Sequence, residues 1–210
     1  MIALSIFMLE KDKSTKDEAI DNRNQEVVKR IEIASENIPE VLGESIPVYP
    51  ELEEYKKTED ILNYPSVGYI KIDAVDVSVC VRYGTSLKEN LDDAACIAEF
   101  SKNEKLFILG HNYEKSSREN KVFHNLLGVE EGDVVELTLI NNIGKEETTS
   151  TFRYKVVFSK RYSEEEFYQD DAKMLMENPD FSEEFNLCLI TCNNDKQGRG
   201  RQVVYCQLQK

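Results

Sequence analysis

The stretch LCLITCNNDKQGRGRQVVYCQL, residues 187–208, carries the pattern on which the fold and the candidate site both depend. An apolar run ends at Cys192, a polar loop with two glycines follows, and a second run, RQVVYCQL, begins at Arg201. Short runs of this kind, bounded by polar and glycine-rich segments, are typical of strands. The stretch therefore predicts two strands, residues 187–191 and 202–208, with Cys192 and Arg201 where the strands meet the loop.

Five more runs upstream are apolar or alternate between apolar and polar residues in the same way. They are VGYIKI (67–72), VDVSVCV (75–81), LFIL (106–109), VVELTLI (134–140) and TFRYKVVF (151–158). In the last run, every second residue from Phe152 to Phe158 should point to one face of a strand. Because the strands do not alternate with helices, the sequence predicts a mainly β fold, an antiparallel barrel or sandwich with helical decoration.

The chain divides by composition into three parts. Residues 1–9 (MIALSIFML) are nearly all apolar but shorter than the roughly 20 residues of a spanning helix, so they are either a remnant of a membrane anchor or a short apolar start. Residues 10–65 are expected to hold an amphipathic helix, about residues 16–37, and a proline-rich connector. Residues 66–210 form the predicted β domain.

Two local features add to this division. Thr15 and Glu18 fit a capping box at the start of the N-terminal helix. The acidic segment 163–185 is predicted to contain further helix. Four of its large apolar residues are the expected anchors: Phe167, Met174, Leu175 and Phe185.

Charge and cysteine spacing exclude several classes of function. The 210 residues carry 40 acidic and 26 basic side chains, a formal charge of −14, which argues against binding to nucleic acid or to an anionic membrane surface. The five cysteines contain no CxxC pair, and no cluster of ligands has the spacing of a metal site. The sequence therefore predicts no metal and no cofactor.

Three residues at predicted strand ends are candidates for catalysis. Cys192 closes a strand before a polar loop, and a thiolate becomes a good nucleophile where a nearby cation lowers the pKa of the thiol. His111 follows a strand and Gly110, and it is one of only two histidines available as a general acid or base. Arg201 keeps its charge at all relevant pH values and offers donors that can stabilise an oxyanion.

Each of these residues, taken alone, also has an ordinary structural explanation as a buried thiol, a surface imidazole or an exposed loop cation. Arg199 lies two residues before Arg201 and competes with it for the same role. The second histidine, His124, sits in VFHNLL and is predicted to occupy a short turn or helix without a catalytic role.

Taken together and in this order, the three candidates resemble the motifs of the sortase family. The resemblance is carried by Gly110-His111 after a strand, by Cys188-Leu189-Ile190-Thr191-Cys192 as a TLxTC strand, and by Arg201-Gln202-Val203-Val204 at the start of the last strand. The segment Phe123…Leu126…Gly132-Asp133 also resembles the family's F-x-x-L segment and Gly-Asp turn. The resemblance covers residues 66–208, and Cys188 departs from it by replacing the first threonine.

This resemblance implies a closed eight-stranded β-barrel with an N-terminal helix, and a transpeptidase without a cofactor. The substrates would be surface proteins with a C-terminal sorting signal similar to LPxTG, and the acceptor an amine of a peptidoglycan precursor or a pilin. Cys192 would form a thioester, His111 would act as general acid and then base, and Arg201 would stabilise the oxyanion. Neighbours of these residues in the motifs are predicted to bind the substrate: Thr191, Asn112 and Leu189.

The resemblance also implies a place of action, the extracellular face of the cell membrane of a Gram-positive bacterium. The class within the family stays open, because Gly110-His111-Asn112 resembles class B whereas Leu189-Ile190-Thr191-Cys192 leans towards class A or D. Two other functions also fit the residues. They are another cysteine peptidase and a non-catalytic β-domain that acts as a binding module in surface-protein assembly.

Overall fold

The computed structural model describes residues 18, 21–35, 41–42, 66–84, 91, 94–98, 101, 105–112, 122–141, 146–168, 185–193 and 200–209. Several sequence features lie outside these residues. They are the apolar segment 1–9, Thr15 of the capping box, the connector 47–65, Met174, Leu175 and Arg199.

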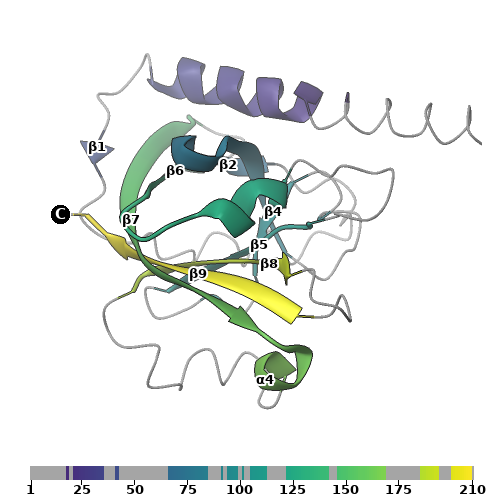
Figure 1. The fold of residues 1–210 in the computed structure, drawn as a ribbon. Coiled ribbons are helices and arrows are strands. Elements are labelled where there is room, and N and C mark those ends of the chain that lie inside the picture. The colour runs from purple at the N-terminus through teal and green to yellow at the C-terminus, as the bar shows by residue number, and fades with distance from the viewer. Residues whose placement is uncertain are drawn as a thin grey trace, which may run out of the picture.

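A closed ring of eight strands forms the body of the molecule (Figure 1). The order around the ring is β7-β6-β2-β3-β4-β5-β8-β9, and β9 pairs with β7 to close it. The strands are β2 (Ser66–Ile72), β3 (Val77–Tyr83), β4 (Ala95–Ile97), β5 (Leu106–Leu109), β6 (Val134–Asn141), β7 (Thr148–Tyr162), β8 (Leu187–Asn193) and β9 (Gly200–Leu208). A further strand, β1 (Val41–Leu42), pairs with β7 in parallel. The predicted mainly β, eight-stranded barrel is confirmed.

Two neighbouring pairs in the ring are parallel, β3 with β4 and β5 with β8, so the barrel is mixed rather than antiparallel throughout. Parallel neighbours need a long connection, because a two-residue hairpin can join only antiparallel strands. The parallel pairing of β5 with β8 matters for the site, because it brings the ends of both strands to the same edge of the barrel.

Alternate residues of the strands fill the barrel, as the sequence pattern predicts. Ile70, Leu137, Tyr154 and Leu189 belong to this core, and all are fully buried. On β8, Leu187 and Leu189 belong to this core. Cys188 and Ile190, which alternate with them, belong to a second apolar cluster on the outer face. Further members of the outer cluster are Phe107, Val203, Tyr205 and Phe185, with Phe167 packed against them.

A β-bulge in β7 corrects one prediction. Val156 pairs with Cys206 and Phe158 with the preceding residue of β9, Tyr205, so Val157 is an extra residue. An extra residue reverses the alternation of side chains beyond it. Phe158 therefore leaves the face that it was predicted to share with Val156, and it stacks on Tyr205 in the outer cluster, with ring centroids 4.2 Å apart.

The predicted amphipathic helix is present over residues 21–35 and packs along one side of the barrel (Figure 1). Val27 is fully buried and packs with Cys80 of β3 and Ile140 of β6. The Asn24 side chain accepts a hydrogen bond from the Cys80 amide over 2.8 Å and donates to the Ser78 carbonyl over 3.3 Å. Among the described strands, none pairs with these backbone groups of β3 on that side, because β4 pairs only with residues 81–83, so the two bonds to Asn24 satisfy them.

In the part of the chain that the structure describes, short helices lie in connections between strands: η2 (Asp73–Val75), η3 (His124–Gly128) and α4 (Glu164–Tyr168). The helix predicted within segment 163–185 corresponds to α4, and the rest of that segment up to residue 184 lies outside the described residues. The placement of His124 on a short helix is confirmed.

Candidate active site

The ends of β5 and β8 are joined by hydrogen bonds that continue past the last paired residues. The parallel register pairs Leu109 with Ile190. Beyond it, the Gly110 amide donates to the Ile190 carbonyl over 3.0 Å, and the Thr191 hydroxyl donates to the Gly110 carbonyl over 2.8 Å. Continuing this register by two residues places His111 beside Cys192.

Gly110 is required at this junction because two side chains pack directly against its α-carbon. A β-carbon at this position would lie 2.4 Å from the Phe123 ring and 2.8 Å from a methyl group of Val122. Both distances are shorter than real carbon contacts, so only glycine fits without displacing its neighbours. The close approach fixes the chain just before His111.

The register of β8 and β9 brings the thiol and the guanidinium together. Cys192 and Arg201 are direct partners in this antiparallel pair. Directly opposite residues in such a pair have β-carbons about 4.5–5.5 Å apart and point to the same face. Arg201 also lies opposite Tyr162 of β7, and its guanidinium is 5.6 Å from the centre of the Phe167 ring of α4.

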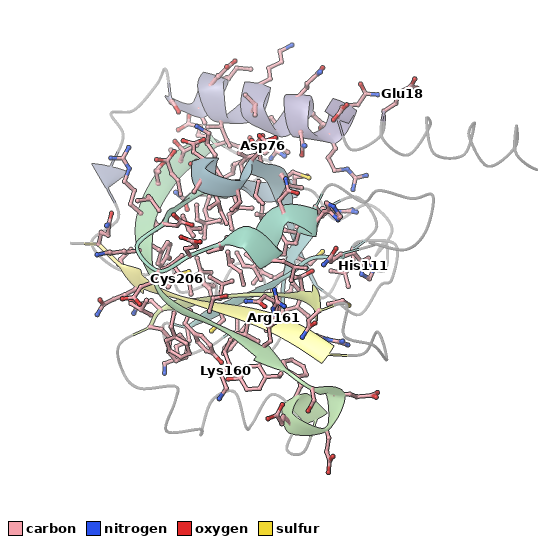
Figure 2. All side chains as sticks on the ribbon, in the orientation of Figure 1. Glu18, Asp76, His111, Lys160, Arg161 and Cys206 are labelled. Atoms are coloured by element: carbon pink, nitrogen blue, oxygen red, sulfur yellow. The ribbon has the colours of Figure 1, made fainter. Side chains whose placement is uncertain are left out.

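All three predicted catalytic residues line one pocket. Its volume is about 110 Å³, and its wall consists of Leu91, Leu109, Gly110, His111, Ile190, Thr191, Cys192 and Arg201. Figure 2 shows His111 at the end of the barrel where β9 begins. The sequence places these side chains in three separate segments, and the barrel topology makes them neighbours.

Cys192 is the only partly exposed thiol among the five cysteines, all of which the structure describes. Cys80, Cys96, Cys188 and Cys206 are buried. Burial raises the pKa of the Cys188 thiol and that of the Cys206 thiol, so both remain protonated at neutral pH. Reactivity with a solute is therefore expected at Cys192 and not at Cys188, although both side chains lie on the same face of β8.

The three residues predicted to bind substrate occupy different environments. Thr191 lines the pocket, but its hydroxyl is already bonded to the Gly110 carbonyl. Asn112 is 5% exposed, and Leu189 is fully buried in the barrel core. Burial of these last two side chains argues against their direct contact with a bound peptide.

The environment of His124 could not be predicted from the sequence. Its Nδ1 atom lies 3.2 Å from the Asn112 Oδ1 atom, and the Asn112 Nδ2 atom donates to the Cys192 carbonyl over 3.0 Å. The sequence predicts only a polar position on a short turn or helix for His124, and nothing near it in the sequence signals this contact. The competing residue Arg199 lies outside the described residues.

Within the described residues, no group of three or more His, Cys, Asp or Glu side chains could hold a metal ion. No described helix has the length and apolar character that crossing a membrane requires.

Comparison with known proteins supports both the family and the fold. The family model described as Sortase domain matches residues 70–209. Among solved structures, a sortase D5 transpeptidase from Clostridium perfringens is 21% identical, with a TM-score of 0.52 over 88% of this chain and 98% of that one. A lid mutant of sortase A from Corynebacterium diphtheriae is 18% identical, with a TM-score of 0.53 over 96% of this chain and 95% of that one.

A third similar structure, sortase C-1 from Actinomyces oris, is 16% identical, with a TM-score of 0.52 over 91% of this chain and 99% of that one. At these identities the structural matches support the fold alone, and they fall in classes A, C and D. No curated protein matches the chain.

Proposed function

The chain belongs to the sortase family of cysteine transpeptidases, and we propose that Cys192, His111 and Arg201 carry its reaction. The observation behind this assignment is the single pocket that all three residues line. A nucleophile, a proton donor and a fixed cation within one small pocket meet the needs of acyl transfer through a thioester.

The reaction begins when the Cys192 thiolate attacks the carbonyl carbon of the scissile peptide bond. The carbonyl oxygen becomes an oxyanion, which the Arg201 guanidinium stabilises by charge and hydrogen bonding. His111 then gives a proton to the leaving amine, and the bond to that amine breaks to leave a thioester on Cys192.

The second half of the reaction releases the product. An amine attacks the thioester carbonyl, His111 accepts its proton, and Cys192 leaves as the thiolate. The thioester intermediate divides one difficult amide exchange into two easier steps, and the same groups serve both.

Family membership supports a sorting-signal substrate in general. We propose the finer assignment that the substrates are surface proteins with a C-terminal signal similar to LPxTG. The acceptor is then an amine of a peptidoglycan precursor or a pilin.

Members of this family are cell-surface enzymes of Gram-positive bacteria, and we infer the same location for this chain. Residues 66–210 serve as its catalytic domain, and residues 10–65 as its N-terminal helix and connector. Neither another type of cysteine peptidase nor a non-catalytic binding module fits the family match.

The test is a transpeptidation assay with a library of sorting-signal peptides and a set of amine acceptors. We expect Cys192→Ala to lower kcat/KM by at least about a thousandfold, as loss of a nucleophile does in related chemistry. Arg201→Ala should lower it by about a hundredfold or more, by analogy with loss of an oxyanion donor. The matched control Cys188→Ala removes a buried thiol of the same strand and should keep most activity. Full activity of Cys192→Ala would contradict the proposal.

A further inference from the structure

A chain of two hydrogen bonds behind the pocket links His124 to the backbone of the proposed nucleophile. The Asn112 side chain is at its centre, and only 5% of this residue is exposed. Its Nδ2 atom donates to the Cys192 carbonyl over 3.0 Å, and its Oδ1 atom lies 3.2 Å from Nδ1 of His124. Neither Asn112 nor His124 lines the pocket itself.

The chemistry of the groups fixes the direction of both bonds. A carbonyl oxygen only accepts, so Asn112 must present its NH₂ group to Cys192. The amide oxygen of Asn112 therefore faces His124, and it too can only accept. His124 must then donate from Nδ1, which requires the ring tautomer that carries its proton on Nδ1.

Residues 122–124, which include His124, also hold His111 in place. The Phe123 amide donates to the His111 carbonyl over 3.2 Å, and Phe123 packs against Gly110. Residues 122–124 thus hold the chain at residues 110–112 through packing and two hydrogen bonds. Since Asn112 follows His111 directly and binds Cys192, it couples the backbone of the proposed general acid to that of the proposed nucleophile.

We propose that Asn112 and His124 are positioning residues that set the distance between His111 and Cys192. This inference rests on the proposed function, because it assigns these residues a part in the same reaction. Neither side chain touches the substrate. A displacement of about 1 Å between reacting groups can cost about a hundredfold in rate. Because the hydrogen bond from Asn112 to the Cys192 carbonyl fixes the ends of β5 and β8 relative to each other, its loss should lower kcat more than it changes KM.

Two substitutions of nearly equal size separate the hydrogen bond from simple packing. In His124→Asn the side-chain amide nitrogen can occupy the place of Nδ1 and keep the donor. In His124→Gln the amide reaches the place of Nε2 and leaves the Asn112 oxygen without its donor. We expect His124→Asn to keep kcat within about threefold of the unaltered chain, and His124→Gln to lower kcat about tenfold with KM unchanged.

The assay reads kcat, KM and the thermal unfolding midpoint of both variants and of the unaltered chain. Equal kcat values for the two variants would overturn the inference, whether both match the unaltered chain or both fall below it. A loss of kcat that only follows a loss of thermal stability would assign His124 a structural role instead. Absence of transpeptidation in the unaltered chain would count against the proposed function.

A second measurement does not depend on activity or on variants. Nitrogen NMR of the histidine rings in the unaltered chain should show the neutral His124 ring with its proton on Nδ1. A proton on Nε2 would leave two acceptors facing each other and would rule out the bond to Asn112. The spectrum therefore tests the hydrogen bond itself, whatever the peptide assay gives.

Discussion

At the scale of single residues, the site depends on a glycine as much as on the reactive side chains. Gly110 allows the Phe123 ring to lie against the backbone that leads into His111. We expect Gly110→Ala to lower the free energy of unfolding by about 1–3 kcal/mol, the usual cost of overpacking. It should also lower kcat/KM, because Phe123 or residues 110–111 must move.

Gly128→Ala is the matched control for this prediction. A β-carbon at Gly128 would lie 3.5 Å from Val75, which is an ordinary contact. Urea unfolding should show a change below about 1 kcal/mol for this variant, and its activity should stay the same. If Gly110→Ala proved as stable and as active as Gly128→Ala, the tight junction at residue 110 would be refuted.

The exposure of the cysteines gives a second prediction at this scale. Only Cys192 is partly exposed, so iodoacetamide should modify one thiol per folded chain and all five after unfolding. Mass spectrometry of the folded protein gives the count and the position. Rapid modification of Cys188 or Cys206 in the folded chain would show that the barrel does not protect them as described.

Part of the candidate site could be predicted from the sequence, because its residues have distinctive types at distinctive places. A chain with two histidines leaves few choices for a general acid, and the boundary between strand and loop marked His111, Cys192 and Arg201. The contacts of Asn112 with His124 and with the Cys192 carbonyl were not visible. They join residues far apart in the sequence, and a single hydrogen bond leaves no periodic signal.

At the scale of elements, the N-terminal helix is held to the barrel by a few specific contacts. Arg30 forms two hydrogen bonds with the Glu147 carboxylate, 2.7 and 3.2 Å long, and a third with the Ser66 carbonyl over 3.1 Å. The side chains of this ion pair are 23% and 22% exposed. We expect Arg30→Ala to lower the free energy of unfolding by about 1–2 kcal/mol.

The control for this prediction is Lys71→Ala, which removes the open ion pair between Lys71 and Asp73. The side chains of that pair are 48% and 81% exposed, so water screens it and no measurable change is expected. Chemical denaturation of both variants gives the comparison. Equal losses from Arg30→Ala and Lys71→Ala would contradict the proposed docking of the helix.

The elements also show where sequence patterns stop being informative. The alternating runs predicted seven of the eight strands in the ring, because one face of each strand is buried and the pattern repeats. Strand β4 was missed because three residues, Ala95–Ile97, are too few to show a period. The bulge at Val157 could not be predicted because it depends on the register with β9, and the local sequence carries no information about that register.

At the scale of the whole molecule, burial of ionisable groups limits stability at alkaline pH. Burial raises the pKa of the thiols of Cys188 and Cys206 above the ordinary value. The folded chain therefore holds these protons more tightly than the unfolded chain does. Their contribution to stability is complete below the unfolded pKa of about 8.5 and is lost as pH rises above it.

We therefore expect the free energy of unfolding to fall once the pH exceeds about 8.5. Each of the two thiols should contribute a loss of about 1.4 kcal/mol per pH unit. Urea unfolding under reducing conditions at a series of pH values measures the slope. The double variant Cys188→Ala/Cys206→Ala is the control and should show a shallower slope. An identical slope in both proteins would mean that these thiols do not carry the effect.

The proposed mechanism requires a covalent bond between Cys192 and an acyl group of the substrate. The most direct measurement is mass spectrometry of the chain after reaction with a peptide that carries a sorting signal, without an amine acceptor. We expect a mass increase equal to the acyl fragment, located on Cys192, lost on addition of an amine and absent from Cys192→Ala. An acyl group on another residue, or full peptide turnover by Cys192→Ala, would contradict the account.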